Sequence, residues 1–265
     1  MKRFYYILIL AFCLVASCDK ENSGAALKSF TAETGLESWA WSTGDVIRVS
    51  NGKSTSDYTY DEATGKFVTE SPLDNSGVFQ AIYPASGAEY TGDHFQMVLP
   101  KEQYASLEDI TKGPLYLWKA KDGVFRFRSL LGVVKISLTG SGTALYESPL
   151  RDLVFTSSDN PVCGIASISN NGEFALSDPS QEVKIICPEG TGVRNSVFFL
   201  LPAQKYPMGS KLRFNFADGK SFESETIMGI VPRRGMTKSY EIEVTSDFFG
   251  PLEEYEDGGI IDDKY

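Results

Sequence analysis

Apolar and polar residues alternate with a period of two along most of this chain. The alternation is clear in five segments, at residues 45–50, 124–128, 133–138, 212–216 and 240–244. Successive side chains of a β-strand point to opposite faces, so this pattern predicts strands with one face on a core and the other in water. No segment sustains the 3.6-residue period of an amphipathic helix. We therefore expect an all-β protein.

Turn signals lie between these segments, at Asn51-Gly52, Thr64-Gly65, Asp122-Gly123, Asn171-Gly172 and Asp218-Gly219. Glycine readily adopts the positive φ that tight hairpin turns require. Two uninterrupted apolar runs, residues 78–83 and 197–201, predict strands that are buried on both faces. Short strands separated by tight turns throughout the chain predict β-sandwiches.

The alternation is interrupted near the middle of the chain, by Gly140-Ser-Gly142 and by the Ser148-Pro149 step. We place a domain boundary within residues 140–150, which predicts an N-terminal β-sandwich at residues 27–145 and a C-terminal one at residues 146–245. Hydrophobic residues make up 42% of the chain and aromatic residues 12%. That composition provides enough apolar surface for a substantial core.

The first 26 residues are expected to export and tether the protein. Residues 4–17 are uncharged and fit the apolar segment of a secretory signal, but they are too few to span a bilayer. They end in Val15-Ala-Ser-Cys18, which resembles the lipobox of bacterial lipoproteins, so Cys18 is the predicted lipidation site. The prediction is a lipoprotein signal peptide at residues 1–17 and a polar tether at residues 18–26. An ordinary cleaved secretory signal is the alternative.

The charge balance restricts the partners of this chain. It has 25 basic and 35 acidic residues and a formal net charge of −10, which becomes −12 for the 248 residues left after removal of residues 1–17. Such a charge repels nucleic acid and anionic membrane surfaces, so we expect no nucleic-acid partner. Membrane contact is expected through the lipid on Cys18. The acidic Asp19-Lys-Glu21 resembles a surface-export signal of lipoproteins in anaerobic Gram-negative bacteria. We therefore expect the protein to be located at the outer membrane or cell surface, or in fimbriae.

Residues suited to catalysis are scarce. The chain has a single histidine, His94, which leaves histidine triads and zinc sites without partners. It contains no Gly-x-Ser-x-Gly elbow and no phosphate-binding glycine loop. We therefore expect no enzyme, no catalytic residue, no metal site and no cofactor. Cys163 and Cys187 could form a disulfide, since the protein is expected to be exported, or they could remain two buried free thiols.

The last segment, residues 246–265, is an acidic tail with spaced apolar residues. Its acidity is typical of a solvated end. Its apolar residues, which include Phe248, Phe249, Ile260 and Ile261, are more typical of a strand that pairs elsewhere. Both interpretations remain open from the sequence.

Several motifs occur in a characteristic order behind the lipobox. The N-terminal half has Trp41-Ser-Thr-Gly-Asp-Val-Ile-Arg-Val49, Phe79-Gln-Ala-Ile-Tyr-Pro-Ala85 and Leu131-Gly-Val-Val-Lys-Ile-Ser-Leu138. The C-terminal half has Phe198-Phe-Leu-Leu-Pro202 and Arg234-Gly-Met-Thr-Lys-Ser-Tyr240. This order resembles the fimbrillin-like family, which comprises type V pilus subunits and related surface lipoproteins of anaerobic Gram-negative bacteria.

The resemblance implies two transthyretin-like, Greek-key β-sandwich domains and a structural or adhesive pilus subunit. In such pili a trypsin-like protease removes an N-terminal strand after a basic residue, and a strand of the next subunit fills the groove. The partners would then be other pilus subunits or further copies of this chain. The candidate processing positions here are Lys28 and Arg48, and residues 27–32 are the expected removable strand, with Phe30 as its buried anchor. The candidate donor strand is the acidic tail, with its four residues named above as anchors.

A second interpretation is a non-polymerising surface module that binds a glycan or a host protein. Such a module displays exposed aromatic side chains, for which Tyr58, Tyr60, Tyr116 and Trp118 are available. Tyr116 and Trp118 would lie on one face of the same strand. Packing in the core is the alternative role for these aromatics.

Overall fold

The structure, a computed structural model, describes residues 26–36, 39–105, 110, 112–139, 148–169, 172–192, 195–226, 229–244 and 249–255. All twenty named elements of these residues are β-strands, which confirms the predicted all-β class. Cys18, the predicted signal peptide and residues 140–147 at the predicted boundary lie outside the described residues. Within the described part of the chain, no helix has the length and apolarity needed to cross a membrane.

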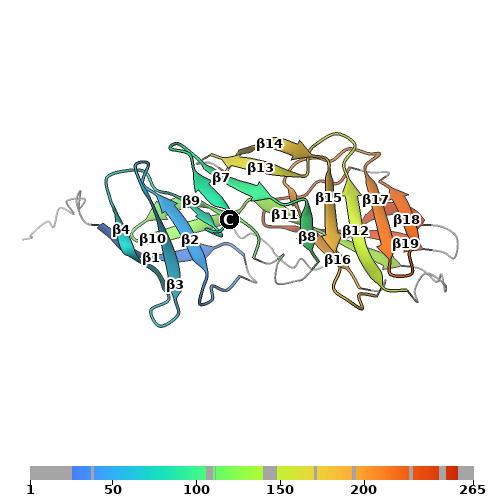
Figure 1. The fold of residues 1–265 in the computed structure, drawn as a ribbon, viewed down its shortest axis with the longest axis horizontal. Helices are drawn as coiled ribbons and strands as arrows, with labels where there is room; N and C mark the ends of the chain where they lie inside the picture. Colours follow the sequence, from blue (N-terminus) through green and yellow to red (C-terminus); the bar gives the residue numbers. More distant parts are fainter. Residues whose placement is uncertain are drawn as a thin grey trace, which may run out of the picture.

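One sheet closes on itself in the order β1 (Ala26–Thr34), β10 (Val124–Ser129), β9 (Leu115–Lys121), β5 (Gln80–Tyr83), β2 (Val46–Ser50), β3 (Thr55–Asp61) and β4 (Lys66–Asp74). It forms the left end of the molecule in Figure 1. The sheet closes because β1 pairs antiparallel with β4 on one side and parallel with β10 on the other. The expected transthyretin-like sandwiches are therefore not confirmed, since seven strands instead form a closed sheet with no free edge.

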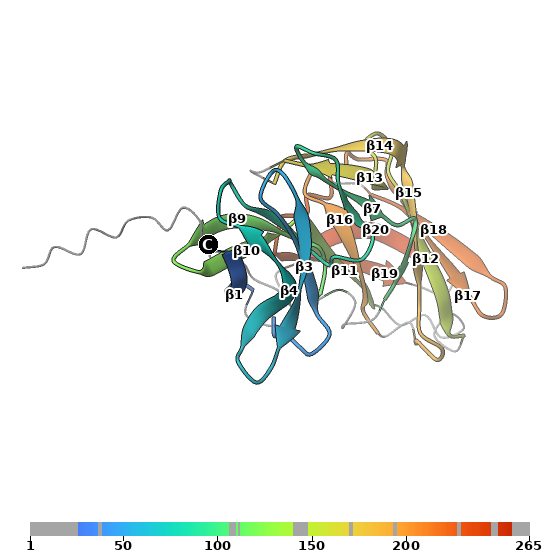
Figure 2. The ribbon, with the colours of Figure 1, turned by 60° about the vertical axis from the view of Figure 1, so that its left-hand side comes forward.

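Three open sheets form the other end of the molecule. The first has the order β14 (Phe174–Ser180), β13 (Cys163–Ile168), β7 (Phe95–Leu99) and β6 (Ala88–Tyr90). The second has the order β18 (Ser221–Glu225), β17 (Lys211–Phe216), β12 (Leu150–Thr156), β15 (Glu182–Ile186) and β8 (Glu102–Tyr104). The third has the order β16 (Val197–Pro202), β11 (Leu131–Thr139), β19 (Thr237–Val244) and β20 (Phe249–Tyr255). Figure 2 shows the open sheets lying beside the closed one.

The five alternating segments all form strands, namely β2, β10, β11, β17 and β19. The turn between β9 and β10 shows why the Asx-Gly signal works. Asp122 and Gly123 have φ values of 53° and 74°, as a two-residue hairpin turn requires. The prediction for residues 78–83 was partly wrong, because the strand begins at Gln80 and the Val78 side chain is 75% exposed.

The buried side chains form two clusters. One fills the closed sheet and includes Phe30, Phe67 and Phe127, while the other lies among the open sheets. Strand β11 contacts both, because Val133 belongs to the first cluster and its neighbour Val134 to the second. Adjacent strand residues point to opposite faces, so a single strand can join two cores.

Several strands pair across the boundary predicted near residue 145. Strand β7 pairs antiparallel with β13, with Phe95 opposite Ile168. Strand β8 pairs in parallel with β15, which follows the predicted boundary. The segment from β6 to β8 thus contributes to the open sheets, although it precedes β9 and β10 of the closed sheet. The division into two domains at that position stays a prediction.

Candidate functional site

Strand β1 is an interior strand of the closed sheet. Phe30 pairs with Phe67 of β4, and Thr31 pairs with Val124 of β10. The Tyr58 hydroxyl donates a hydrogen bond to the Leu27 carbonyl at 2.6 Å. The predicted strand over residues 27–32 is therefore confirmed. Its removal would unpair backbone groups of both neighbouring strands.

Phe30 anchors β1 in the core, as the sequence predicted. Its side chain is 1% exposed. Its ring stacks on Phe125 with 4.2 Å between centroids and on Phe67 with 5.5 Å, and it lies 5.1 Å from Tyr58. An aromatic side chain buried among three others contributes strongly to stability.

A register shift lies in the first half of β1. The pairing with β4 shifts between Leu27 and Ser29, where residues 69–72 of β4 stand opposite Lys28 alone. This irregularity is larger than an ordinary β-bulge, which adds one residue to one strand. Leu27 packs against the same core as Phe30, and Lys28 is exposed. Strict alternation would place Lys28 rather than Leu27 on the face of Phe30, so the alternation does not hold at this irregular stretch.

The two candidate processing positions differ in accessibility. Lys28 is exposed and lies where β1 pairs with β4 alone, since the pairing with β10 begins at Thr31. Arg48 lies in β2 between β3 and β5. Its Nε and Nη2 donate to the two carboxylate oxygens of Asp57 at 2.7 and 2.8 Å. A protease would have to break this bidentate ion pair and two strand pairings to reach Arg48.

Part of the acidic tail forms a strand of its own chain. Residues 249–255 form β20, which pairs antiparallel with β19 at the edge of its sheet. Leu252 is completely buried. Of the candidate donor anchors, Phe249 is the first residue of β20, whereas Phe248, Ile260 and Ile261 lie outside the described residues. The tail is thus a paired strand over residues 249–255.

Cys163 and Cys187 are free and buried, so the candidate disulfide is not formed in the structure. The Cys163 thiol donates to the Glu182 carbonyl at 3.3 Å. Burial raises the pKa of Cys163, and it raises the pKa of Cys187 to about 12. Because the thiolate is the reactive form, both groups behave as apolar core residues at neutral pH.

A partly buried ion pair, not foreseen from the sequence, connects the segment before β9 to the closed sheet. The Lys112 ammonium lies 3.2 Å from the Asp45 carboxylate and donates to the Ser42 hydroxyl at 2.6 Å. The Tyr83 hydroxyl donates to the same carboxylate at 2.9 Å. Burial, with the hydrogen bond to Asp45, raises the pKa of Tyr83. Fully bonded, this cluster has a structural role.

The four candidate binding aromatics divide between core and surface. Tyr58 and Tyr116 are 0% and 4% exposed, so they are core residues. Tyr60 is half-buried and packs on Phe67, with 5.3 Å between ring centroids. Trp118 is 42% exposed. Only Trp118 of the four therefore offers a large exposed aromatic surface.

Trp118 lies at a groove of about 400 Å³ on the outer face of the closed sheet, which we call the outer groove. Its lining comes from residues 77–82 around β5, residues 116–120 of β9, Phe95, Ile168 and Ser169. Gly172 lies against the Tyr116 ring, so close that an added Cβ would lie 2.1 Å from the ring. The β13–β14 hairpin thereby covers Tyr116 and leaves Trp118 exposed.

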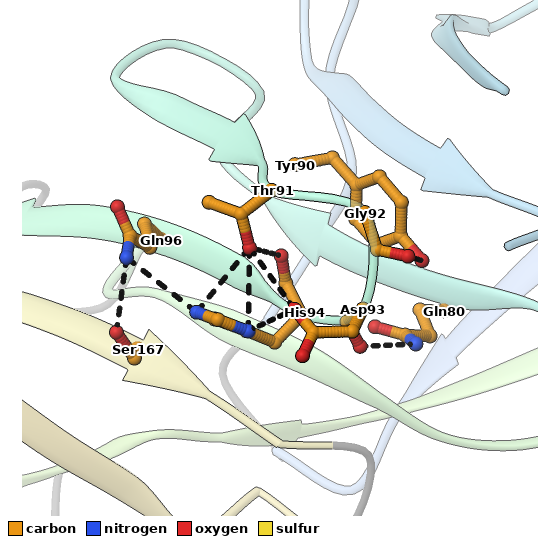
Figure 3. Close-up of polar contacts among 8 residues, drawn as sticks. All are labelled: Gln80, Tyr90, Thr91, Gly92, Asp93, His94, Gln96 and Ser167. Atoms are coloured by element: carbon orange, nitrogen blue, oxygen red, sulfur yellow. Dashed lines mark hydrogen bonds and ion pairs between the residues drawn. The ribbon is translucent and has the colours of Figure 1, made fainter. Parts of the chain in front are cut away.

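A polar network supports the neighbouring turn between β6 and β7, as Figure 3 shows. Gln80, which lines the outer groove, donates to the Asp93 carbonyl at 3.0 Å. Thr91 donates to the His94 carbonyl at 3.1 Å, and the His94 ring contacts the Asp93 carboxylate. This contact lowers the pKa of Asp93. His94 thus stabilises a turn, and the described residues contain no group of three ligands suited to a metal ion.

No protein-family model matches the chain, and no curated protein matches it in sequence. Two solved structures, both described as a "putative cell adhesion protein", are similar. One, from Bacteroides ovatus, is 14% identical with a TM-score of 0.63 over 90% of this chain and 98% of that chain. The other, from Bacteroides uniformis, is 14% identical with a TM-score of 0.55 over 89% of this chain and 97% of that chain.

A fimbrial protein from Bacteroides vulgatus also matches, with 10% identity and a TM-score of 0.43 over 87% of this chain and 99% of that chain. That TM-score is too low to argue from. The chain thus shares the fold of the two cell adhesion proteins.

Proposed function

We propose that this chain is a fimbrillin-like cell-surface lipoprotein, a structural or adhesive subunit of a type V-type pilus that assembles by strand exchange. The observation that carries the proposal is β1, the first described strand. It is paired on both sides and fills the core of the closed sheet through Phe30. The fold shared with two cell adhesion proteins supports the same function. The function needs no catalytic residue, metal or cofactor.

Removal of β1 would create an acceptor groove. It would unpair the edges of β4 and β10 and open an apolar space between Phe67 and Phe125. A strand from another subunit can satisfy both needs at once, through main-chain hydrogen bonds and an apolar anchor. Lys28 suits processing better than Arg48, because it is exposed and lies near the start of β1.

The proposed donor is the acidic tail. In the structure its β20 pairs with β19 alone, at the edge of a sheet. An edge strand can leave its sheet by breaking one ladder of hydrogen bonds, whereas an interior strand must break two. Phe248, Phe249, Ile260 and Ile261 remain the proposed apolar anchors of the donor.

Deletion of residues 19–35 should convert the mature chain from a monomer into oligomers, because the unfilled groove accepts the tail of another copy. Size-exclusion chromatography with light scattering measures the change. A synthetic peptide of residues 26–34, added in excess, should reduce the oligomers by refilling the groove. The same peptide with Phe30→Asp is the matched control and should have no effect.

A second deletion, of residues 247–265 in addition to 19–35, should abolish the oligomers. Because it also removes β20, circular dichroism must show that the shortened chain is still folded, and deletion of residues 256–265 alone separates the two parts of the tail. If the 19–35 deletion leaves a folded monomer, or the added tail deletion leaves folded oligomers, this chain does not assemble by exchange of its tail. The anchor, tip or binding-module roles would then lead.

We further propose that the protein is anchored to the outer membrane through acyl chains on Cys18. Cys18→Ser should abolish acylation, because serine has no thiol to carry the lipid, and two or three acyl chains are what make such anchoring stable. Metabolic labelling with a fatty-acid precursor, followed by membrane fractionation, measures both effects. Cys13→Ser is the matched control and should be labelled as strongly as the natural chain. Equal label in Cys18→Ser would refute the anchor.

A second candidate function is a surface module that binds a glycan or a host protein. The observation that favours it is the exposure of Trp118 at the outer groove. Exposed aromatic rings beside a concave surface are a usual feature of binding sites. The two functions are compatible, because the groove lies on the outer face of the closed sheet, whereas Phe30 of β1 packs in the core inside that sheet.

A further inference from the structure

The Trp118 ring lies beside a cation and at the outer groove. Strand β9, which carries Trp118, lies between β10 and β5 in the closed sheet. From β10, the Arg128 guanidinium carbon lies 3.8 Å from the centre of the indole ring. On the β5 side lies the outer groove, which both Trp118 and Gln80 line. A cation therefore covers one face of a ring whose side chain also lines the groove.

The lining of the outer groove carries a positive charge. Its lining includes Lys119 and contains no aspartate or glutamate. Among the described residues, neither Lys119 nor Arg128 has an ion-pair partner, and the Arg128 Nε is buried without a hydrogen bond. In a chain of net charge −10, such a site attracts an anion locally while the rest of the surface repels it.

We propose that the outer groove binds a carboxylated saccharide. The flat C–H face of a sugar ring is apolar and packs on an indole ring, which Arg128 holds in place. A carboxylate on the saccharide is attracted by Lys119, the charged residue of the groove lining, and charge-assisted hydrogen bonds are stronger than neutral ones. The Gln80 side-chain amide, whose nitrogen donates to the Asp93 carbonyl, has an oxygen that can accept a hydrogen bond from a sugar hydroxyl.

This ligand chemistry accounts for the groove better than two others do. A purely apolar ligand would cover Lys119 without pairing it, which is costly for a charge taken out of water. An acidic peptide would pair Lys119 but would make little use of the flat ring of Trp118 and of the Gln80 amide. The inference rests on the second candidate function. Its experiment keeps β1 in place, so a failure of saccharide binding can be distinguished from a failure of strand exchange.

The experiment uses the mature, lipid-free monomer and isothermal titration calorimetry. The probes are tetragalacturonate and sialyllactose, which carry carboxylates from two different sugar sources. Lactose and a neutral galactose tetramer are the uncharged comparators, and a glutamate tetrapeptide is the peptide comparator. We expect at least one carboxylated saccharide to bind about tenfold or more tightly than its neutral counterpart, a difference of about 1.4 kcal/mol.

Variants locate the binding. Trp118→Ala and Lys119→Gln should each weaken it about tenfold or more. Tyr104→Ala is the control for the first, because Tyr104 is 62% exposed and lies outside the groove lining. Lys121→Gln is the control for the second, because Lys121 lies on the same strand and pairs with Asp122 at 3.9 Å. Both controls should bind as the natural chain does.

Four outcomes would overturn the proposal. They are no binding of either carboxylated saccharide at millimolar concentration, equal binding of the neutral comparators, equal binding of the glutamate tetrapeptide, and unchanged binding by Trp118→Ala. The third would identify an acidic peptide as the ligand class. None of the four bears on strand exchange, because the monomer is measured with β1 in place.

Discussion

Phe30→Ala should lower the free energy of unfolding by about 3–5 kcal/mol, the usual range for truncating a buried phenylalanine. The substitution removes a ring that is 1% exposed and stacks on Phe125 at 4.2 Å. Tyr58 and Phe67 lie on its other sides. Because three rings surround the resulting cavity, we expect little collapse and a cost near the upper end of the range.

Urea denaturation of the mature chain, followed by circular dichroism, measures this loss. Lys28→Ala is the matched control on the same strand, since Lys28 is exposed and surface substitutions usually change stability by less than about 0.5 kcal/mol. A loss below about 1 kcal/mol for Phe30→Ala would mean that β1 contributes little to the folded monomer. A strand from another subunit would then gain little binding free energy in the groove left by β1.

The same substitution connects stability to assembly. If β1 contributes several kcal/mol to the stability of the monomer, a strand that replaces it should gain a binding free energy of similar size. A peptide of residues 26–34 should therefore bind a chain that lacks residues 19–35, and the Phe30→Asp peptide should not. The two experiments measure the contribution of one side chain from opposite directions.

The strands and hairpin turns of this fold are local features, and the sequence predicts them well. The alternation in residues 45–50 and 124–128 predicted β2 and β10, since both strands have one buried and one half-buried face. Phe30 was predicted as an anchor for the same reason. The Asp122-Gly123 turn could be predicted because few residues other than glycine adopt positive φ easily.

The sheet order could not be read in the same way. Strand β7 pairs with β13, although β13 lies beyond the boundary expected near residue 145. Such pairings between distant segments leave no local pattern. The irregular pairing of β1 with β4 beside Lys28 also has no signature in the sequence. Closure of the first sheet depends on the parallel pairing of β1 with β10, a contact between residues about 90 positions apart.

The outer groove was only partly predictable. The sequence named Trp118 among four candidate aromatics, but it could not separate that exposed ring from Tyr116 two residues earlier. The separation comes from the β13–β14 hairpin, whose Gly172 covers Tyr116. Arg128 was not considered, because its position over Trp118 follows from the register of β10 on β9. Cross-strand pairs of this kind become visible only when the register is known.

Leu252→Ala should lower the free energy of unfolding by about 2–5 kcal/mol, the range for truncating a buried leucine. Leu252 is 0% exposed and belongs to the core of the open sheets. It lies opposite Ile242 in the pairing of β20 with β19. The size of the loss shows whether residues 249–255 of the acidic tail are part of the folded monomer or only a solvated end.

Urea denaturation again measures the effect, with Val98→Ala as the control, because Val98 is 59% exposed on a strand of another sheet. A change within about 0.5 kcal/mol for Leu252→Ala, equal to that of the control, would show that β20 does not hold its place in solution. A large loss would set a condition on the proposed donor. The tail must then gain more from the groove left by β1 than it gives up at β19, and Phe30→Ala and Leu252→Ala together supply the two free energies to compare.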